Sequence, residues 1–218
     1  MIRLTLINPN TNVDTTAMMV SIATEAVSRD VMISGVTAPW GPPLITSAEA
    51  LDAAAEAVSA LTDSLTDADG VIVAGFGDPG LEALRARLAI PVTGIAEAGM
   101  AEAARDGRRF AVVTTTPDLV DAIAIKATKE GHQNFAGTWV TPGDPARLMA
   151  DAFQLETALH QACLTAIEDS GVEAIVIGGG PLAVAGRRLV GRIPVPLIEP
   201  VPAAARLACA RARRKAGP

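Results

Sequence analysis

The feature that most constrains the fold of this chain is an internal repeat, in which three segments recur about one hundred residues further along. The pairs are residues 4–11 with 111–117, residues 69–81 with 173–182, and residues 90–95 with 193–198. Each segment is a short run rich in β-branched residues that ends in Gly, Pro, Asn or Thr. Such a run is typical of a buried parallel strand that leads into a polar loop. Because the repeats of solenoid proteins are far shorter, the spacing predicts two similar lobes.

Strand and helix patterns alternate through both halves, which predicts an α/β fold with a mostly parallel sheet flanked by helices in each lobe. We place the first lobe at residues 1–105 and the second at residues 106–218, with the C-terminal helix of the first lobe as a candidate for crossing over. No low-complexity linker separates the halves, so we expect the two pseudo-symmetric lobes to share an interface. An active-site cleft is expected between them, because loops at the carboxyl ends of both sheets converge there.

The net charge and the lengths of the apolar runs limit the kinds of partner that the protein can bind. The net charge of −6 argues against a nucleic-acid-binding surface. No apolar run approaches membrane-spanning length, and the first one ends at Asn8-Pro9, too early for a signal peptide. We therefore expect a cytoplasmic protein whose partner is a small molecule rather than a nucleic acid or a membrane. We also expect a homo-oligomer.

The two cysteines do not suggest chemistry. Cys163 lies on the apolar face of a helix expected from about Pro145 to Asp169, and Cys209 lies among alanines in the last helix. Both are interpreted as small core residues. Their spacing indicates neither a zinc site nor a disulfide. The sequence also shows no Ser/His/Asp catalytic set and no cluster of metal ligands.

Glycine-rich loops follow the third strand of each half. Gly178, Gly179 and Gly180 lie between a strand and a helix, where backbone N–H groups can approach a carboxylate or imide oxygen closely. The spacing fits neither a Walker nor a Rossmann motif. A tight turn without a ligand is the alternative, but the first half has Gly75, followed by Phe76, at the equivalent place. That coincidence favours a ligand site.

Short polar side chains close the first strand of each half. Asn8 ends one strand, and Thr114 and Thr115 end the other. Their amide and hydroxyl groups suit a small polar substrate, although each alone is more often a cap or a turn former. Residues 38–46 interrupt the regular alternation, and they form either a rim over the cleft or a plain crossover loop.

Few groups could transfer protons. Asp78 and Glu199 are the candidates, although the simplest role for Asp78 is to cap the helix that follows Gly75. Glu97 and Glu199 could exchange protons as a pair across the cleft, but stabilising a helix start is the favoured role for Glu97.

Four segments resemble the aspartate/glutamate/hydantoin racemase superfamily, most closely the hydantoin and allantoin racemases. They read Leu-Ile-Asn-Pro-Asn-Thr at residues 6–11, Ala-Gly-Phe-Gly-Asp-Pro-Gly-Leu at 74–81, Ala-Val-Val-Thr-Thr at 111–115 and Pro-Leu-Ile-Glu-Pro-Val at 196–201. The resemblance covers nearly the whole chain in order. It implies two pseudo-symmetric lobes, a small-molecule site between them and no cofactor.

The resemblance fails where that family carries its chemistry. Family members typically remove a proton from a carbon beside a carbonyl with one cysteine and return it with another, one thiol following the third strand of each lobe. Those two positions match Gly75 and Gly179 in this chain, and the usual final Asp-Gly reads Glu199-Pro200. Because glycine carries no proton, two-thiol racemisation is excluded for this sequence. We expect the two glycines to face each other across a gap that no side chain fills.

Two functions are compatible with this pattern. The first is an enzyme acting on a small carboxylate, cyclic ureide or related carbonyl compound, with an oxyanion held by the glycine loops. Asp78, Glu199 or a water in the places of the missing thiols would carry the proton, in an isomerase, lyase or hydrolase reaction. The second is a non-catalytic binding or accessory protein on the same fold.

Overall fold

The structure, a computed structural model, describes residues 1–65 and 67–216, so Gly217 and Pro218 of the expected second lobe lie outside the described residues. Its strands form two four-stranded sheets with the orders β2-β1-β3-β4 and β6-β5-β7-β8. The first sheet contains β1 (Ile2–Asn8), β2 (Val31–Thr37), β3 (Gly70–Val73) and β4 (Val92–Gly94). The second contains β5 (Phe110–Thr114), β6 (Phe135–Val140), β7 (Ala174–Ile177) and β8 (Leu197–Ile198).

All neighbouring strands in both sheets are parallel. The repeated segments occupy equivalent places: β1 and β5 are central strands, β3 and β7 lie beside them, and β4 and β8 are edges. The predicted fold class is therefore confirmed. The proposed division near residue 105 falls between β4 and β5.

The helices follow the strands as the alternating pattern predicts, with one difference. They are α1 (Val13–Glu25), α2 (Ala48–Ser59), α3 (Leu81–Arg87), α4 (Ile95–Ala103), α5 (Val120–Lys129), α6 (Pro145–Ala150), α7 (Ala152–Ser170), α8 (Ala183–Leu189) and α9 (Pro200–Ala216). The single helix predicted from Pro145 to Asp169 is wrong, because Asp151 separates α6 from α7. The Asp151 backbone is extended and its carboxylate accepts hydrogen bonds from the N–H groups of Phe153 and Gln154, so a new helix begins there.

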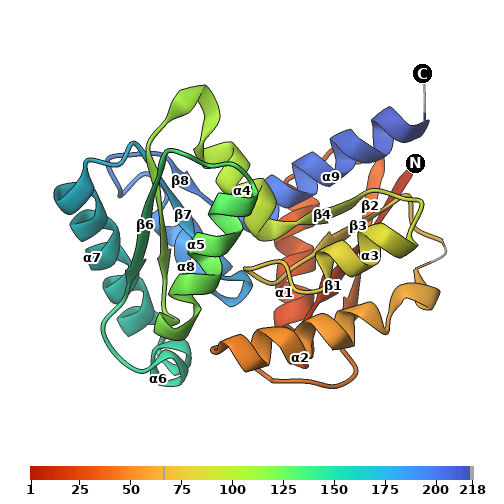
Figure 1. Cartoon of the computed structure of the whole chain (residues 1–218), viewed down its shortest axis with the longest axis horizontal. Coiled ribbons are helices and arrows are strands. Elements are labelled where there is room, and N and C mark those ends of the chain that lie inside the picture. Colours follow the sequence, from red (N-terminus) through yellow and green to blue (C-terminus); the bar gives the residue numbers. More distant parts are fainter. Residues whose placement is uncertain (66, 217–218) are drawn as a thin grey trace.

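Two helices cross over, and each packs against the lobe opposite to the one whose strands precede it in the sequence. Helix α4, which follows the first sheet, packs against β7 and β8 of the second, whereas α9 at the end of the chain packs against α1, β1, β3 and β4 of the first lobe. Figure 1 shows α9 (blue) beside the first-lobe strands and α4 reaching between the lobes. Crossing therefore occurs in both directions, where the sequence suggested it for the first lobe alone.

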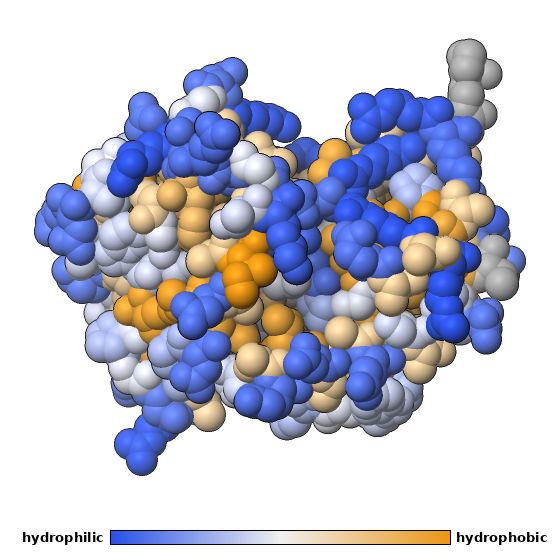
Figure 2. Space-filling model, viewed as in Figure 1, coloured by the Kyte–Doolittle hydropathy of each residue, from blue (hydrophilic) through white to orange (hydrophobic). Residues whose placement is uncertain are grey.

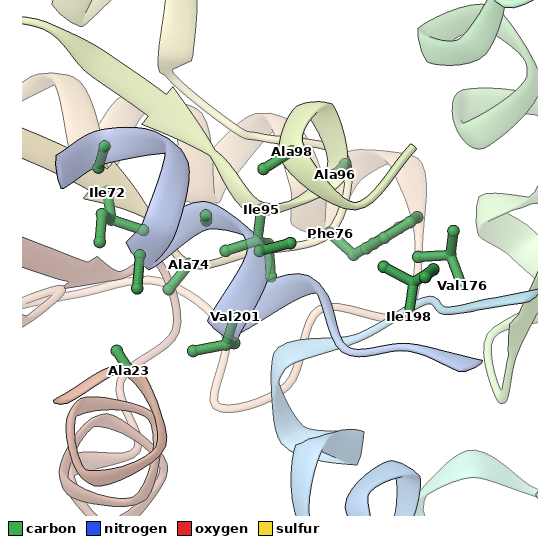
Figure 3. Close-up of a cluster of buried hydrophobic side chains, with 14 of the residues drawn as sticks. Ala23, Ile72, Ala74, Phe76, Ile95, Ala96, Ala98, Val176, Ile198 and Val201 are labelled. Carbon is green, nitrogen blue, oxygen red and sulfur yellow. The ribbon is translucent and has the colours of Figure 1, made fainter. Parts of the chain in front are cut away.

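The crossing helices join the lobes through one continuous core. One hydrophobic cluster contains Ile72 of the first sheet, Val176 and Ile198 of the second, Ile95 of α4 and Val201 of α9. Figure 3 shows these side chains gathered together. All are almost fully buried, and burying each stabilises the fold by about 1.5–3 kcal/mol. The lobes are thus fixed relative to each other by shared apolar contacts.

An ion-pair network around Glu97 secures the crossing of α9. The Arg211 guanidinium donates to both carboxylate oxygens, at 2.6 Å to Oε1 and 3.0 Å to Oε2, and Arg85 donates to Oε2 at 2.8 Å. Glu97 Oε2 also accepts a hydrogen bond from the Gly94 N–H at 3.2 Å, in keeping with the predicted role at a helix start. Burial raises the pKa of Glu97, but the charges of Arg211 and Arg85 outweigh that effect and hold the pKa at about 2.

Replacing Glu97 by glutamine is expected to lower the free energy of unfolding at neutral pH by about 2–3 kcal/mol. The Glu97 pKa is about 2 in the folded protein against an ordinary value of 4.5. A depressed carboxyl pKa stabilises the fold above the unfolded value, and this contribution disappears as the pH falls through the folded value. The difference between wild type and Glu97→Gln should therefore shrink as the pH falls from 4.5 towards 2.

Urea titrations across this pH range measure the effect. Glu102→Gln on the same helix is the control, because its partner Arg206 is 48% exposed and such pairs contribute about 0–1 kcal/mol. A Glu97→Gln difference that does not change with pH would contradict the role assigned to this carboxylate.

Candidate functional site

A pocket lies where the loops at the carboxyl ends of the strands of both lobes meet. It encloses about 500 Å³, part of it open to solvent. The first lobe contributes the loops after β1 and β3, and the second contributes those after β5 and β7. Figure 2 shows hydrophobic residues in the middle of the viewed face, where the lobes meet, with hydrophilic residues on either side.

Six of the seven predicted binding residues line this pocket, namely Gly75, Phe76, Thr114, Thr115, Gly179 and Gly180. They come from three loops that are far apart in the sequence, so the structure brings together the glycine loops and the threonines as the repeat suggested. The apolar part of the wall includes Leu119, Met149 and Leu182.

Asn8, the seventh predicted residue, is not on the wall. Its side chain is buried, and Nδ2 donates hydrogen bonds to Asn10 Oδ1 at 2.9 Å, the Asn12 carbonyl at 2.9 Å and Thr16 Oγ1 at 3.0 Å. Its Oδ1 accepts from the Asn10 N–H at 3.2 Å. Asn8 therefore shapes the loop, and Asn10 lines the pocket instead. The sequence Asn8-Pro-Asn10 contains two amides two residues apart, and either could line a pocket.

The three threonines after β5 have different roles. Thr114 Oγ1 donates to the Gly178 carbonyl at 2.8 Å and lies 3.0 Å from Thr116 Oγ1. The bond to Gly178 joins the end of β5 to the loop after β7. Thr115 also lines the pocket, and within the described residues its hydroxyl has no hydrogen-bond partner. Thr115 is therefore the threonine whose hydroxyl is available to a ligand.

Backbone donors are available on three sides of the pocket. Within the described part of the chain, the N–H groups of Phe76, Thr115 and Gly180 have no hydrogen-bond acceptor. Each lies in a loop after β3, β5 or β7, and all three residues line the pocket. Preorganised N–H groups of this kind stabilise negative charge on a ligand oxygen.

Neither candidate acid–base residue lies on the wall. Asp78 is buried, where its carboxylate accepts hydrogen bonds from the Ala96 and Glu97 N–H groups and pairs with Lys126. Asp78 thus caps α4, and the predicted cap of α3 is wrong because Gly80 occupies that position. Glu199 pairs with Arg187 at 3.1 Å. Among the described residues that line the pocket, none has an ionisable side chain.

The cysteines lie in the core, as predicted. Cys163 is buried in the second-lobe core and Cys209 in the core shared by both lobes. Burial raises the pKa of the Cys163 thiol to about 12, so this thiol stays protonated at neutral pH. Neither cysteine lines the pocket.

The two pocket glycines differ in the space around them. A β-carbon on Gly179, whose φ of 170° is ordinary extended backbone, would lie 3.1 Å from Leu182 Cγ. A β-carbon on Gly75 would lie only 2.5 Å from Pro9 Cγ. The expectation of a gap without side chains is therefore wrong at Gly75, where the Pro9 ring occupies the space.

The segment of residues 38–46 forms part of the pocket rim. Leu44 and Ile45 line the pocket. The segment is anchored by hydrogen bonds from the Thr11 N–H to the Pro42 carbonyl and from the Ala38 N–H to the Asn8 carbonyl. Of the two interpretations of this segment, the structure favours the rim.

This fold and this pocket define an α/β protein with a small-molecule site between two related lobes, and comparison with known proteins identifies the family. The model of the Asp/Glu/Hydantoin racemase family matches residues 4–208, and the chain belongs to this family. Within residues 1–65 and 67–216, no helix has the length and apolar character needed to cross a membrane.

Similar proteins include isomerases. The hydantoin racemase of Paenarthrobacter aurescens is 30% identical over 94% of this chain and 89% of its own length. The structure of allantoin racemase from Klebsiella pneumoniae is 30% identical with a TM-score of 0.90, covering 96% of this chain and 87% of that one. Allantoin racemase from Pseudomonas fluorescens is 27% identical with a TM-score of 0.91, covering 96% and 90%.

Proposed function

We propose that this chain is a cofactor-independent enzyme of the racemase family that takes a small cyclic ureide, or a related carbonyl compound, into the pocket between its lobes. The observation that carries the proposal is a wall of uncharged donors and acceptors contributed by both lobes. The Thr115 hydroxyl can donate and accept hydrogen bonds, whereas Asn10 offers its Nδ2 donor because its Oδ1 already accepts from Asn8 Nδ2 and the Asn12 N–H. These groups suit the alternating C=O and N–H groups of a hydantoin ring. The hydantoin and allantoin racemases among its relatives support this substrate class.

The proposed chemistry differs from two-thiol racemisation. The free N–H groups of Phe76, Thr115 and Gly180 would hold the carbonyl oxygens of the ligand, including one on which negative charge develops. Gly75 and Gly179 occupy the places that the family resemblance assigns to thiols, so protons would move through water rather than through a side chain of the wall. Isomerisation, elimination and hydrolysis of the ring are the reaction types to separate.

A second function, binding without turnover, is favoured by one observation. The described wall has no ionisable side chain to act as general acid or base. An accessory protein that holds a ureide would need only the hydrogen-bonding groups described above.

We further propose that the protein works in the cytoplasm as a homo-oligomer. Two buried free cysteines are typical of a reducing compartment. A second copy of the chain would cover apolar side chains that are exposed in the monomer, such as Ile125 and Phe153.

Thr115→Val is expected to weaken the binding of 5-isopropylhydantoin or allantoin about five- to tenfold, because one hydrogen bond is lost. Calorimetric titration measures this, and Thr138→Val is the control because the Thr138 hydroxyl is buried, has no partner among the described residues and lies outside the pocket lining. Chromatography of the incubated ligand then separates the two functions. A new product supports the enzyme, unchanged ligand supports the binding protein, and no binding by the wild type contradicts both.

A further inference from the structure

The two walls of the pocket are also joined by an ion pair that the proposed function does not use. Lys126 Nζ lies 2.9 Å from Asp78 Oδ2. Asp78 belongs to the first-lobe loop of residues 75–80, two positions after Phe76, whereas Lys126 belongs to helix α5 of the second lobe. The Asp78 side chain is 0% exposed and that of Lys126 12% exposed. A pair so well shielded from water attracts more strongly than a surface pair.

The loop of residues 75–80 needs external contacts to keep its conformation. Asp78 has a φ of +54°, which is uncommon for a residue with a side chain. The Asp78 carboxylate accepts hydrogen bonds from Ala96 N–H at 2.8 Å and Glu97 N–H at 2.9 Å. Gly94 leaves the room for this carboxylate, because a β-carbon there would lie 2.1 Å from Asp78 Cγ. Such a backbone persists only where its surroundings hold it.

The pair connects directly to both walls. The Asp78 N–H donates to the Gly75 carbonyl at 2.9 Å, so the position of Asp78 bears on Gly75 and Phe76 in the pocket. On the other side, α5 follows the loop that carries Thr114, Thr115 and Leu119 on the wall. A movement of α5 away from Asp78 would therefore separate the two sets of ligand-facing groups.

We propose that Lys126 is a positioning residue of the pocket, which holds the loop of residues 75–80 of the first lobe against helix α5 of the second. The proposal rests on the proposed function, because it assumes that this pocket binds the ligand. Burial lowers the pKa of Lys126, but the charges of Asp78 and Glu130 outweigh that effect and leave the pKa raised. The ammonium group is therefore charged at neutral pH. Glu130, one turn further along the chain from Lys126, holds it from the other side at 2.9 Å.

The test compares Lys126→Met with Lys129→Met. Lys129 lies on the same helix and lines the same surface hollow as Asp78, but it is exposed and has no ion pair with any described residue. Lys126→Met should weaken the binding of 5-isopropylhydantoin about tenfold or more, whereas Lys129→Met should leave it within about twofold. Hydrogen exchange of the Asp78, Ala96 and Glu97 amides should accelerate about tenfold or more in Lys126→Met alone.

A second variant separates positioning from general stability. In Asp78→Asn/Lys126→Met neither charge of the pair is left behind, so the melting temperature should recover towards the wild-type value while the hydantoin affinity stays low. Folded Lys126→Met with wild-type affinity, or a double variant whose affinity recovers with its stability, would overturn the proposal. If the wild type binds no hydantoin, the proposed function fails, and the hydrogen-exchange rates of these amides alone test the positioning role of Lys126. Unchanged exchange in Lys126→Met then overturns the positioning role.

Discussion

Placing cysteine at both Gly75 and Gly179 is expected to make the protein racemise 5-substituted hydantoins far faster than the wild-type chain does. The family resemblance assigns one thiol to each of these positions, and both glycines line the pocket between the lobes. Each single variant should gain little, because each face of the substrate carbon needs its own proton carrier. Chiral chromatography of a single enantiomer measures the gain.

The structure also predicts which of the two cysteine substitutions destabilises the fold more. Gly179→Cys should fold almost as well as the wild type, because its backbone is extended and Leu182 has to move by only a few tenths of an ångström. Gly75→Cys should lose about 1–3 kcal/mol, the usual effect of overpacking, because its β-carbon would meet the Pro9 ring at 2.5 Å. Adding Pro9→Ala removes the atom that would clash, and should restore part of the loss.

The matched control is the Gly75→Ser/Gly179→Ser variant, which adds side chains of similar size without a thiol. It should remain inactive. A folded double-cysteine protein that binds hydantoins but racemises none of them, with Pro9 or with Pro9→Ala, would show that the two positions do not face opposite sides of the ligand.

Replacing Asp78 by alanine is expected to lower the free energy of unfolding by about 3–5 kcal/mol, the usual result of removing one partner from a buried ion pair. The change leaves the Lys126 ammonium without its partner in the first lobe and leaves two N–H groups of α4 without acceptors. Alanine also has to adopt the positive φ of this position. Chemical denaturation measures the loss.

Asp78→Asn is the control for this prediction. Asparagine keeps a side-chain oxygen for one α4 N–H group and tolerates the left-handed backbone. The loss should therefore be smaller than for alanine. A loss below about 1 kcal/mol for alanine would show that this buried carboxylate contributes little to the stability of the fold. Equal losses for the two variants would show that the asparagine oxygen replaces none of its contacts.

Local pattern was sufficient to predict both sheets and most of the pocket. The β-branched runs identify the strands, and a parallel sheet places their carboxyl ends together, so Gly75, Thr114 and Gly179 meet where expected. Asn10 was missed because Asn8 and Asn10 carry the same chemistry two residues apart, and the sequence does not show which amide nitrogen is left free. In the structure Asn8 Nδ2 makes three hydrogen bonds within the first lobe, whereas Asn10 uses its Oδ1.

The roles of the carboxylates could not be predicted, because their partners are remote in sequence. Asp78 pairs with Lys126 in the other lobe and caps α4 rather than α3. Glu97 pairs with Arg211 on a helix that crosses from the end of the chain. Local spacing identified these residues as charged groups near helix starts, but only the crossing of α4 and α9 determines which charges become buried together.

Deuterium exchange at C5 of an enantiopure hydantoin, measured together with its binding isotherm, tests most directly whether the pocket binds a ureide without two-thiol racemisation. The expected result is saturable binding by the wild type, with exchange far slower than in the variant in which Gly75 and Gly179 are both cysteine. Exchange and racemisation by the wild type as fast as in that variant would contradict the claim, because the two positions assigned to thiols would then not be needed for rapid proton transfer.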